Sequence, residues 1–177
     1  MSYDIRPATA SDEPYLWDML YYAANMADDG ASSPEAAKTH PYLAAYVRDW
    51  GRPGDLGIIA LAPTDQQAVG AAWLRLLMEP DHRYAAVGVN IPELAIAVHP
   101  TVRGQGLGRR LLTQLLAMAR MVYPAVVLSV REHNPARRLY ERAGFTIIDT
   151  IVNRVGGESF VMLYTFRSVD DNATGAG

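Results

Sequence analysis

The glycine-rich loop at residues 103–108 constrains the fold of this chain more than any other feature. It reads Arg-Gly-Gln-Gly-Leu-Gly and follows the apolar stretch 93–98 after four residues. Beyond its start, apolar residues recur at helical spacing, at Leu107, Leu111, Leu115, Met118 and Val122. A strand, a glycine loop and a helix in this order bring backbone N–H groups and the positive end of a helix to one place. The sequence therefore predicts a cradle for a phosphate group.

Positive charge gathers around this loop. Residues 103–142 contain eight arginines and only two acidic residues, in a chain whose formal net charge is −3. Arg109 and Arg110 fall in the first turn of the predicted helix, where positive charge opposes the helix dipole. A bound diphosphate would compensate these charges, and the planar guanidinium suits phosphate. The pattern favours an anionic ligand, although solvated helix faces account for some of these arginines.

Three other interpretations of the loop fit its sequence less well: a turn without a ligand, a Walker loop and a dinucleotide-binding loop. A tight strand-to-helix turn without a ligand needs fewer than three glycines. A Walker loop ends in Gly-Lys-Ser/Thr, and the single lysine of the chain is Lys38. A dinucleotide fingerprint would have a glycine three residues after Gly106, where Arg109 stands instead. The spacing therefore argues against both common nucleotide-binding loops.

Hydrophobic periodicity predicts a single-domain α/β protein, with one domain at residues 1–167 and a flexible tail at 168–177. About seven strands are expected, at residues 3–7, 56–61, 69–78, 93–98, 125–130, 145–152 and 160–166. About four helices are expected, at residues 11–25, 34–50, 109–123 and 134–143. The one strand–helix–strand crossover predicts parallel strands at the centre of a mixed sheet.

Composition excludes several classes of function. The chain has no cysteine, which excludes disulfides, thiolate metal sites and a cysteine nucleophile. No two histidines have the spacing of metal ligands, so no metal is expected. The net charge argues against a nucleic-acid partner. Because neither a signal peptide nor an apolar run of about 20 residues is present, a cytoplasmic protein without a membrane partner is expected.

Two sequence motifs resemble those of the GNAT acetyltransferase superfamily. Residues 103–108 are similar to its acetyl-CoA signature, which has Arg or Gln, two residues, Gly, one residue, and Gly or Ala. Residues 134–145, Asn-Pro-Ala-Arg-Arg-Leu-Tyr-Glu-Arg-Ala-Gly-Phe, are similar to its second conserved stretch. The strand exit at 97–100 and the opening at 5–9 also resemble the family. The likeness in element order spans roughly residues 3–166.

The resemblance implies a sheet splayed between its fourth and fifth strands, with acetyl-CoA held in the gap. The pantetheine arm would bind backbone groups near Ile96 and Val98, and the pyrophosphate would lie on the glycine loop. The residues expected to bind the cofactor are Ile96, Val98, Arg103, Gly104, Gln105, Gly106, Leu107, Gly108, Arg109 and Asn134. Family members are often homodimers, and the sequence leaves the oligomeric state open.

The reaction implied is direct transfer of the acetyl group to a primary amine of a small molecule, amino acid or peptide, through a ternary complex. Tyr140 stands at the family's tyrosine and is the expected general acid; the alternative is a helical tyrosine that packs beside Leu139. Glu93 lies near a family carboxylate and is the expected base. By alternation it shares a face with Ala95 and Ala97; the alternative is a solvated carboxylate at a strand end.

Asn134 and Ser129 are further positions that bear on the cofactor and the substrate. Asn134 resembles a pantetheine ligand, yet Asn followed by Pro also begins a helix. Ser129 stands where enzymes that acetylate protein N-termini often have a glutamate, which weakens that assignment. The acceptor pocket is expected from the first two helices, the connection 79–92 and the final hairpin turn, with candidate aromatic or apolar residues Tyr21, Tyr22, Met26, Trp73 and Tyr84. A non-catalytic acyl-CoA sensor with the same fold is the alternative function.

Overall fold

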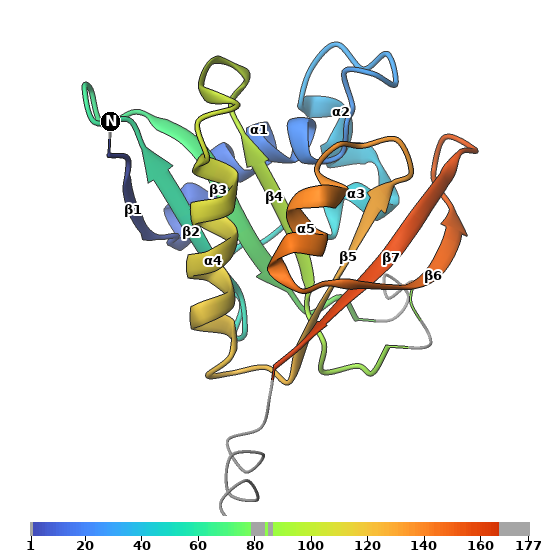
Figure 1. Cartoon of the computed structure of the whole chain (residues 1–177). Coiled ribbons are helices and arrows are strands. Elements are labelled where there is room, and N and C mark those ends of the chain that lie inside the picture. Colours follow the sequence, from blue (N-terminus) through green and yellow to red (C-terminus); the bar gives the residue numbers. More distant parts are fainter. Residues whose placement is uncertain (1, 79–83, 85–86, 167–177) are drawn as a thin grey trace, which may run out of the picture.

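A computed structural model describes residues 2–78, 84 and 87–166 of the chain. Its centre is one seven-stranded sheet in the order β1-β2-β3-β4-β5-β7-β6 (Figure 1). The strands are β1 (Asp4–Pro7), β2 (Leu56–Leu61), β3 (Ala68–Arg75), β4 (Glu93–Val98), β5 (Ala125–Arg131), β6 (Thr146–Val152) and β7 (Glu158–Thr165). The predicted α/β class and strand number are confirmed. The predicted tail and half of the connection 79–92 lie outside the described residues.

The described residues form five α-helices and two short 3₁₀ turns. These are η1 (Ala10–Asp12), α1 (Glu13–Ala23), α2 (Glu35–Thr39), α3 (Pro41–Ala44), η2 (Pro100–Val102), α4 (Leu107–Ala119) and α5 (Arg137–Ala143). In Figure 1, α4 and α5 lie on one face of the sheet, and α1, α2 and α3 lie on the other. The loop before α4 and the loop before α5 therefore open on the same side of the molecule.

The prediction of one helix over residues 34–50 is wrong, because Pro41 divides it. A proline disfavours helical backbone in the residue before it, and His40 is extended, with φ −82° and ψ 122°. The Nδ1 atom of His40 then accepts hydrogen bonds from the N–H groups of Tyr42 and Leu43, at 3.3 and 3.4 Å. These bonds start α3 as a separate helix, which gives five helices instead of about four.

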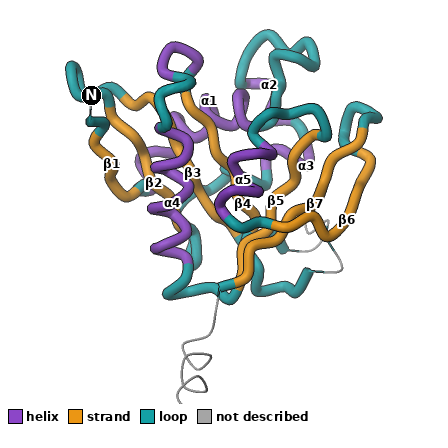
Figure 2. The backbone as a smooth tube through the Cα atoms, in the orientation of Figure 1, coloured by secondary structure: helices purple, strands orange, loops and turns teal. Residues whose placement is uncertain are grey.

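The predicted splay between the fourth and fifth strands is present. All neighbouring strands are antiparallel except β4 and β5, which are parallel and pair at Glu93 and Val127 alone. Beyond this pair the two strands diverge, as the ribbon and the backbone tube both show (Figures 1 and 2). The loops before α4 and α5 flank the open end of this gap.

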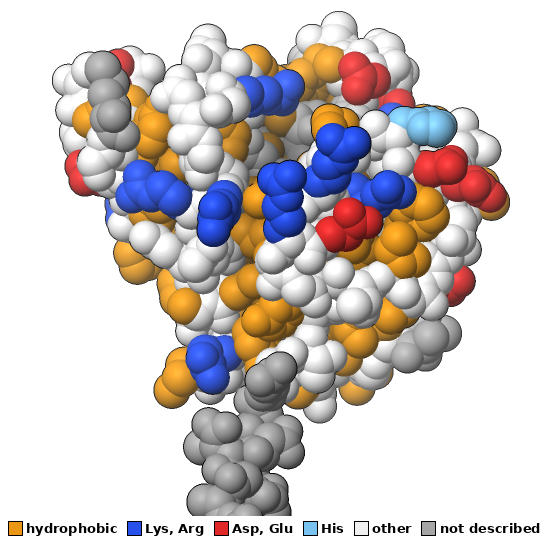
Figure 3. Space-filling view, viewed as in Figure 1, with side chains coloured by type: hydrophobic (Ala, Val, Ile, Leu, Met, Phe, Trp, Pro, Cys, Tyr) orange, Lys and Arg blue, Asp and Glu red, His pale blue; other side chains and the backbone are white. Residues whose placement is uncertain are grey.

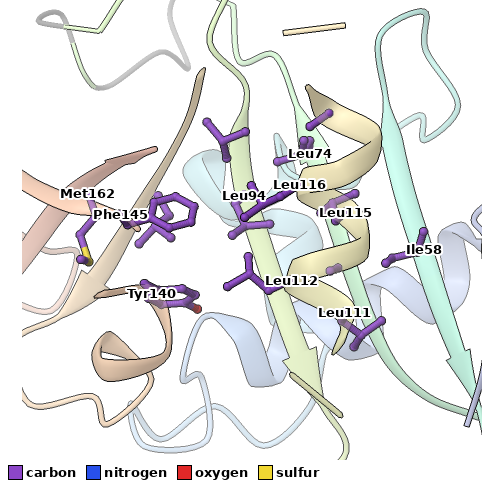
Figure 4. Packing of buried hydrophobic residues seen from close by; sticks show 14 of the residues in the cluster. Ile58, Leu74, Leu94, Leu111, Leu112, Leu115, Leu116, Tyr140, Phe145 and Met162 are labelled. Atoms are coloured by element: carbon purple, nitrogen blue, oxygen red, sulfur yellow. The ribbon is translucent and has the colours of Figure 1, made fainter. Parts of the chain in front are cut away.

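Each face of the sheet carries its own hydrophobic core. On one face, the leucines of α4 pack against β2, β3 and β4, with Leu111 and Leu115 fully buried (Figure 4). On the other face, α1 and α3 cover Trp73 of β3 and the small residues Ala95 and Ala97 of β4. The alternation predicted for β4 is confirmed, because Leu94 belongs to the first core.

Candidate active site

Two glycines of the loop are required by backbone conformation. Gly104 and Gly106 have φ angles of 77° and 78°, in the left-handed region that side chains disfavour. A Cβ atom at either position would meet nothing within 4 Å, so space is not the reason for glycine. Gly108 is helical, and a Cβ there would lie 3.7 and 3.8 Å from the side chains of Leu139 and Val98. The loop therefore turns sharply into α4 and leaves its outer surface open.

The backbone N–H groups of this turn point to an anion site. The first N–H groups of an α-helix have no acceptor within the helix. Arg110 is the first residue of α4 whose N–H bonds back into the loop, to the carbonyl oxygen of Gly106 at 3.2 Å. Among the hydrogen bonds of the described residues, none gives an acceptor to the N–H groups of residues 104–109. These groups are therefore available to an anion, as the predicted cradle requires.

The side chains of the loop mostly turn away from this cradle. Gln105 accepts a hydrogen bond from the Tyr3 hydroxyl at 2.6 Å, and Leu107 is buried in the core. Leu107 therefore offers a ligand only its backbone groups. The Arg103 guanidinium lies 5.8 Å from the centroid of the Tyr22 ring and donates to the Val98 carbonyl oxygen at 3.3 Å. Figure 3 shows basic side chains in a band across the face of the molecule on which α4 and α5 lie. Arg109 is exposed.

Backbone groups of β4 face the gap at the positions expected to bind pantetheine. The N–H of Val127 donates to the Pro92 carbonyl oxygen at 3.0 Å, so the carbonyl group of Pro92 points toward β5. The N–H of His99 instead donates to Val69 of β3, at 2.8 Å. Because peptide groups alternate in direction along a strand, those of Ile96 and Val98 point into the gap.

Two adjoining cavities occupy the gap. The smaller has a volume of about 120 Å³ and the larger, a groove, of about 860 Å³. Ile96, Asn134 and Tyr140 line both cavities. Glu93 lines the smaller cavity, whereas Val98 and Arg103 line the groove. The structure therefore brings the predicted residues of the two motifs together, although they are far apart in the sequence.

The sequence allowed two interpretations of Tyr140, a general acid beside the cofactor or a packed helical tyrosine. Its position in the structure has features of both. Its side chain is 8% exposed, and its ring meets that of Phe145 edge-on with 5.9 Å between the centroids. Its hydroxyl points from α5 toward β4 (Figure 4), and it lines both cavities. Burial raises the pKa of Tyr140 above its ordinary value of 10.0. The phenol thus carries its proton at neutral pH.

Glu93 is buried, so the alternative of a solvated carboxylate is wrong. Only 4% of the residue is exposed. Its Oε1 atom accepts hydrogen bonds from the hydroxyl of Tyr46 and, at 2.9 Å, from that of Tyr84. Tyr84 was a candidate to line the acceptor pocket, and it instead contacts this carboxylate. Two phenols from separate loops thus orient Glu93 at the closed end of the gap.

Asn134 holds the loop before α5. Its Oδ1 atom accepts a hydrogen bond from the N–H of Ala136 at 2.9 Å, and its carbonyl oxygen accepts one from the N–H of Arg137 at 3.1 Å. Because the helix proper begins at Arg137, Asn134 shapes the turn that precedes it. The residue also lines both cavities, so its structural role and the expected binding role are compatible.

The sequence missed an ionic cluster on the cavity wall. The cluster consists of Asp29, Arg131 and Arg154, from the turn after α1, the end of β5 and the β6–β7 turn. Arg131 binds Asp29 through two nitrogens, at 2.8 and 2.6 Å. The Arg131 hydrogen bond is the main reason that the pKa of Asp29 is lowered. No local pattern links residues so far apart, although Arg131 lay in the arginine-rich segment.

The candidates for the acceptor pocket divide into core and cavity. Trp73 and Met26 are buried in the core on the α1 side, and the Tyr21 hydroxyl donates to the Ala31 carbonyl oxygen at 2.9 Å. Tyr22 lines the groove. In the described part of the chain, no helix has the length and apolar character to cross a membrane, and no three acidic or histidine side chains form a group that could bind a metal.

Comparisons with known proteins agree with this geometry. The family model described as "Acetyltransferase (GNAT) family" matches residues 17–145. A putative acetyltransferase, yncA, from Salmonella typhimurium, solved with its cofactor acetyl-CoA, has a TM-score of 0.70 and 21% identity, over 95% of this chain and 96% of that one. No curated protein matches the sequence.

Two further solved structures share the fold. The ribosomal-protein-alanine N-acetyltransferase of Brucella melitensis has a TM-score of 0.63 and 21% identity, over 92% of this chain and 99% of that one. The AAC(6')-Ib enzyme in complex with ribostamycin and coenzyme A has a TM-score of 0.64 and 19% identity, over 99% and 100%. With the matching family model, the glycine cradle and the splayed sheet, the chain belongs to the acetyltransferase (GNAT) family.

Proposed function

We propose that the protein is an N-acetyltransferase that moves the acetyl group of acetyl-CoA directly onto a primary amine in a ternary complex. The observation that carries this proposal is the gap between β4 and β5, where Glu93 and Tyr140 line the smaller cavity and the adjoining groove reaches Arg103, the first residue of the glycine loop. Structural relatives solved with acetyl-CoA or coenzyme A support the choice of donor. A cytoplasmic location and a homodimer remain expectations from the sequence.

The chain offers acetyl-CoA three kinds of contact. The N–H groups of residues 104–109 suit the pyrophosphate, because they lack acceptors among the described residues and lie at the positive end of α4. The exposed Arg109 adds positive charge there. The peptide groups of Ile96 and Val98 suit the amides of the pantetheine arm, and Asn134 lies across the groove from them. Acetyl-CoA supplies a thioester whose C–S bond breaks as the new C–N bond forms.

Tyr140 and Glu93 have the environments that proton transfer needs. The buried carboxylate of Glu93 would accept, directly or through water, the proton that the substrate ammonium must lose before the neutral amine attacks the thioester carbonyl. Tyr46 and Tyr84 keep its Oε1 atom in place. Tyr140, whose raised pKa keeps the phenol protonated, would donate to the departing sulfur. Both groups line the smaller cavity, so the acceptor nitrogen would sit there.

Binding of the donor is tested by thermal unfolding with acetyl-CoA, and with ATP and NAD as controls. A ligand at 100 times its dissociation constant adds about 2.7 kcal/mol of stability, which raises the melting temperature of a domain of this size by about 5 °C or more. A shift with acetyl-CoA alone supports the donor. A larger shift with ATP or NAD contradicts it.

Catalysis is tested by Tyr140→Phe, with Tyr164→Phe as the matched control. Both tyrosines contact the Phe145 ring, but Tyr164 lines neither cavity of the gap. We expect Tyr140→Phe to retain acetyl-CoA binding and to lose at least tenfold in CoA release with an amine, because a general acid contributes more than that. Equal turnover would exclude Tyr140 as the acid. Binding without CoA release from any amine, in the unchanged protein, would favour the acyl-CoA sensor.

A further inference from the structure

The ionic cluster of Asp29, Arg131 and Arg154 carries an excess of positive charge into the smaller cavity. Both arginines pair with the one carboxylate of Asp29, and their side chains are 24% and 16% exposed. One guanidinium charge is therefore left without a matching acid inside the cluster. Both arginines line the smaller cavity, together with Asn153 of the β6–β7 turn. A cavity wall of this kind attracts an anion.

Several hydrogen-bond donors of the two guanidinium groups have no acceptor among the described residues. Each guanidinium has five N–H donors. Arg131 uses Nη1 and Nη2 for Asp29, with a long contact from Nη2 to the Ala24 carbonyl oxygen. Arg154 uses Nη2 for Asp29 and Ala24. Among the described residues, no acceptor is found for Nε of either arginine or for Nη1 of Arg154. These donors are available for a planar, two-oxygen group such as a carboxylate.

Negative charge lies at the other end of the same cavity. Glu93 pairs in register with Val127 of β5, and Arg131 follows four residues later on that strand. Four residues of strand span about 13 Å, and both long side chains line the cavity between these points. A ligand in the cavity therefore meets a carboxylate at one end and guanidinium groups at the other.

We propose that the acceptor is a primary amine that carries a carboxylate, that is, an amino acid. Its nitrogen lies toward Glu93, and its carboxylate binds Arg131 and Arg154. This inference rests on the proposed acetyl transfer and narrows its substrate. Arg154 and Glu93 line the smaller cavity and not the groove that suits pantetheine, whereas Arg131 lines both. The anion subsite for the acceptor is thus distinct from the cradle of residues 104–109, which suits the donor.

The first test compares amines in matched pairs with the unchanged protein. CoA release is assayed with a set of α-amino acids and with a series of ω-amino acids of increasing chain length that starts at glycine. Each acid is compared with its own amide. Removal of the carboxylate charge leaves the amine and the chain length intact. We expect kcat/KM to be at least tenfold higher for the acid of the best pair. The chain length of that acid reports the distance between the two charged ends of the cavity.

The second test uses Arg154→Gln, with Arg120→Gln as the control. Arg120 is exposed at the end of α4 and lines neither cavity of the gap. Arg154→Gln should lower kcat/KM for the amino acid at least tenfold, through KM, and leave its amide and the dissociation constant of acetyl-CoA unchanged. Arg120→Gln should change none of these values.

The outcomes separate this inference from the function on which it rests. If amides react as well as their acids, or if Arg154→Gln weakens acetyl-CoA binding, the anion subsite is refuted while acetyl transfer stands. If no amine of either kind releases CoA, acetyl transfer itself fails. Because the first test needs no variant, misfolding of Arg154→Gln cannot decide the result.

Discussion

Two clusters of arginine and aspartate in this protein use the same chemistry in opposite ways. In the first, Arg75 at the end of β3 is 1% exposed and binds Asp55 through Nε and Nη2, at 3.0 and 2.7 Å. Its remaining donors bind the carbonyl oxygens of Ala45, Arg48 and Asp49. All five donors are thereby used, and the guanidinium ties the segment after α3 to the sheet.

The second cluster, around Asp29, is left incomplete. Its two arginines share one carboxylate, and several of their donors have no acceptor in the described part of the chain. The first cluster is saturated and touches neither cavity of the gap, whereas the second lines the smaller one. The comparison suggests that saturation of the donors, rather than the presence of an ion pair, separates an arginine that holds the fold from one that can bind a ligand.

The largest effect is expected from Arg75→Met. This change leaves the Asp55 carboxylate buried and removes the donors of three carbonyl groups, so we expect a loss of about 3–5 kcal/mol in the free energy of unfolding. Urea unfolding measures it, with Arg120→Met as an exposed control of the same chemistry. A loss below about 1 kcal/mol would show that water replaces the guanidinium, and the two clusters would then not differ as described.

A smaller and pH-dependent effect is expected from Asp29→Asn. Hydrogen bonding to Arg131 lowers the pKa of Asp29, and burial opposes this less strongly. A lowered folded pKa means that the carboxylate contributes stability above its unfolded pKa of about 3.9, and that this contribution is lost as pH falls through the folded value. We expect a deficit of about 1–2 kcal/mol in the variant at neutral pH.

The pH profile provides the control for Asp29→Asn. The difference in free energy of unfolding between the two proteins should stay constant from neutral pH down to about pH 5, and should shrink below about pH 4. A deficit that persists unchanged through acid pH would mean that the packing of the side chain, and not its charge, stabilises the cluster.

The sequence predicts the parts of the fold that depend on local patterns. The strand 93–98 and the turn into α4 follow from an apolar run and from glycines that the left-handed backbone requires. The helix predicted at 34–50 failed at Pro41, although proline is itself a local signal. The residues on both sides of His40 have helical character, and the prediction therefore continued the helix through His40 and Pro41.

The candidate site is predictable only where a motif carries it. Tyr140 and Asn134 could be named from one stretch of sequence, and the structure places both beside the gap. The burial of Glu93 could not be predicted, because Tyr46 lies 47 residues away and contacts Glu93 only after α3 packs on the sheet. Asp29 and Arg131 are 102 residues apart, and such a pair becomes visible only in three dimensions.

The smallest effect is expected from Arg154→Lys, and its comparison with Arg75→Lys sharpens the contrast between the two clusters most. Lysine keeps the charge but not the planar fork with its five donors. Arg154→Lys removes few existing bonds from an incomplete, partly exposed cluster, so we expect a change below about 1 kcal/mol in the free energy of unfolding.

Arg75→Lys is the matched partner, because it abandons at least two bonds of a saturated and buried network. It should cost about 2 kcal/mol or more, measured by urea unfolding at neutral pH beside Arg154→Lys. If the two lysine variants lose equal stability, the number of occupied donors does not distinguish the clusters. The excess of donors around Asp29 would then lose its meaning as a mark of a binding site.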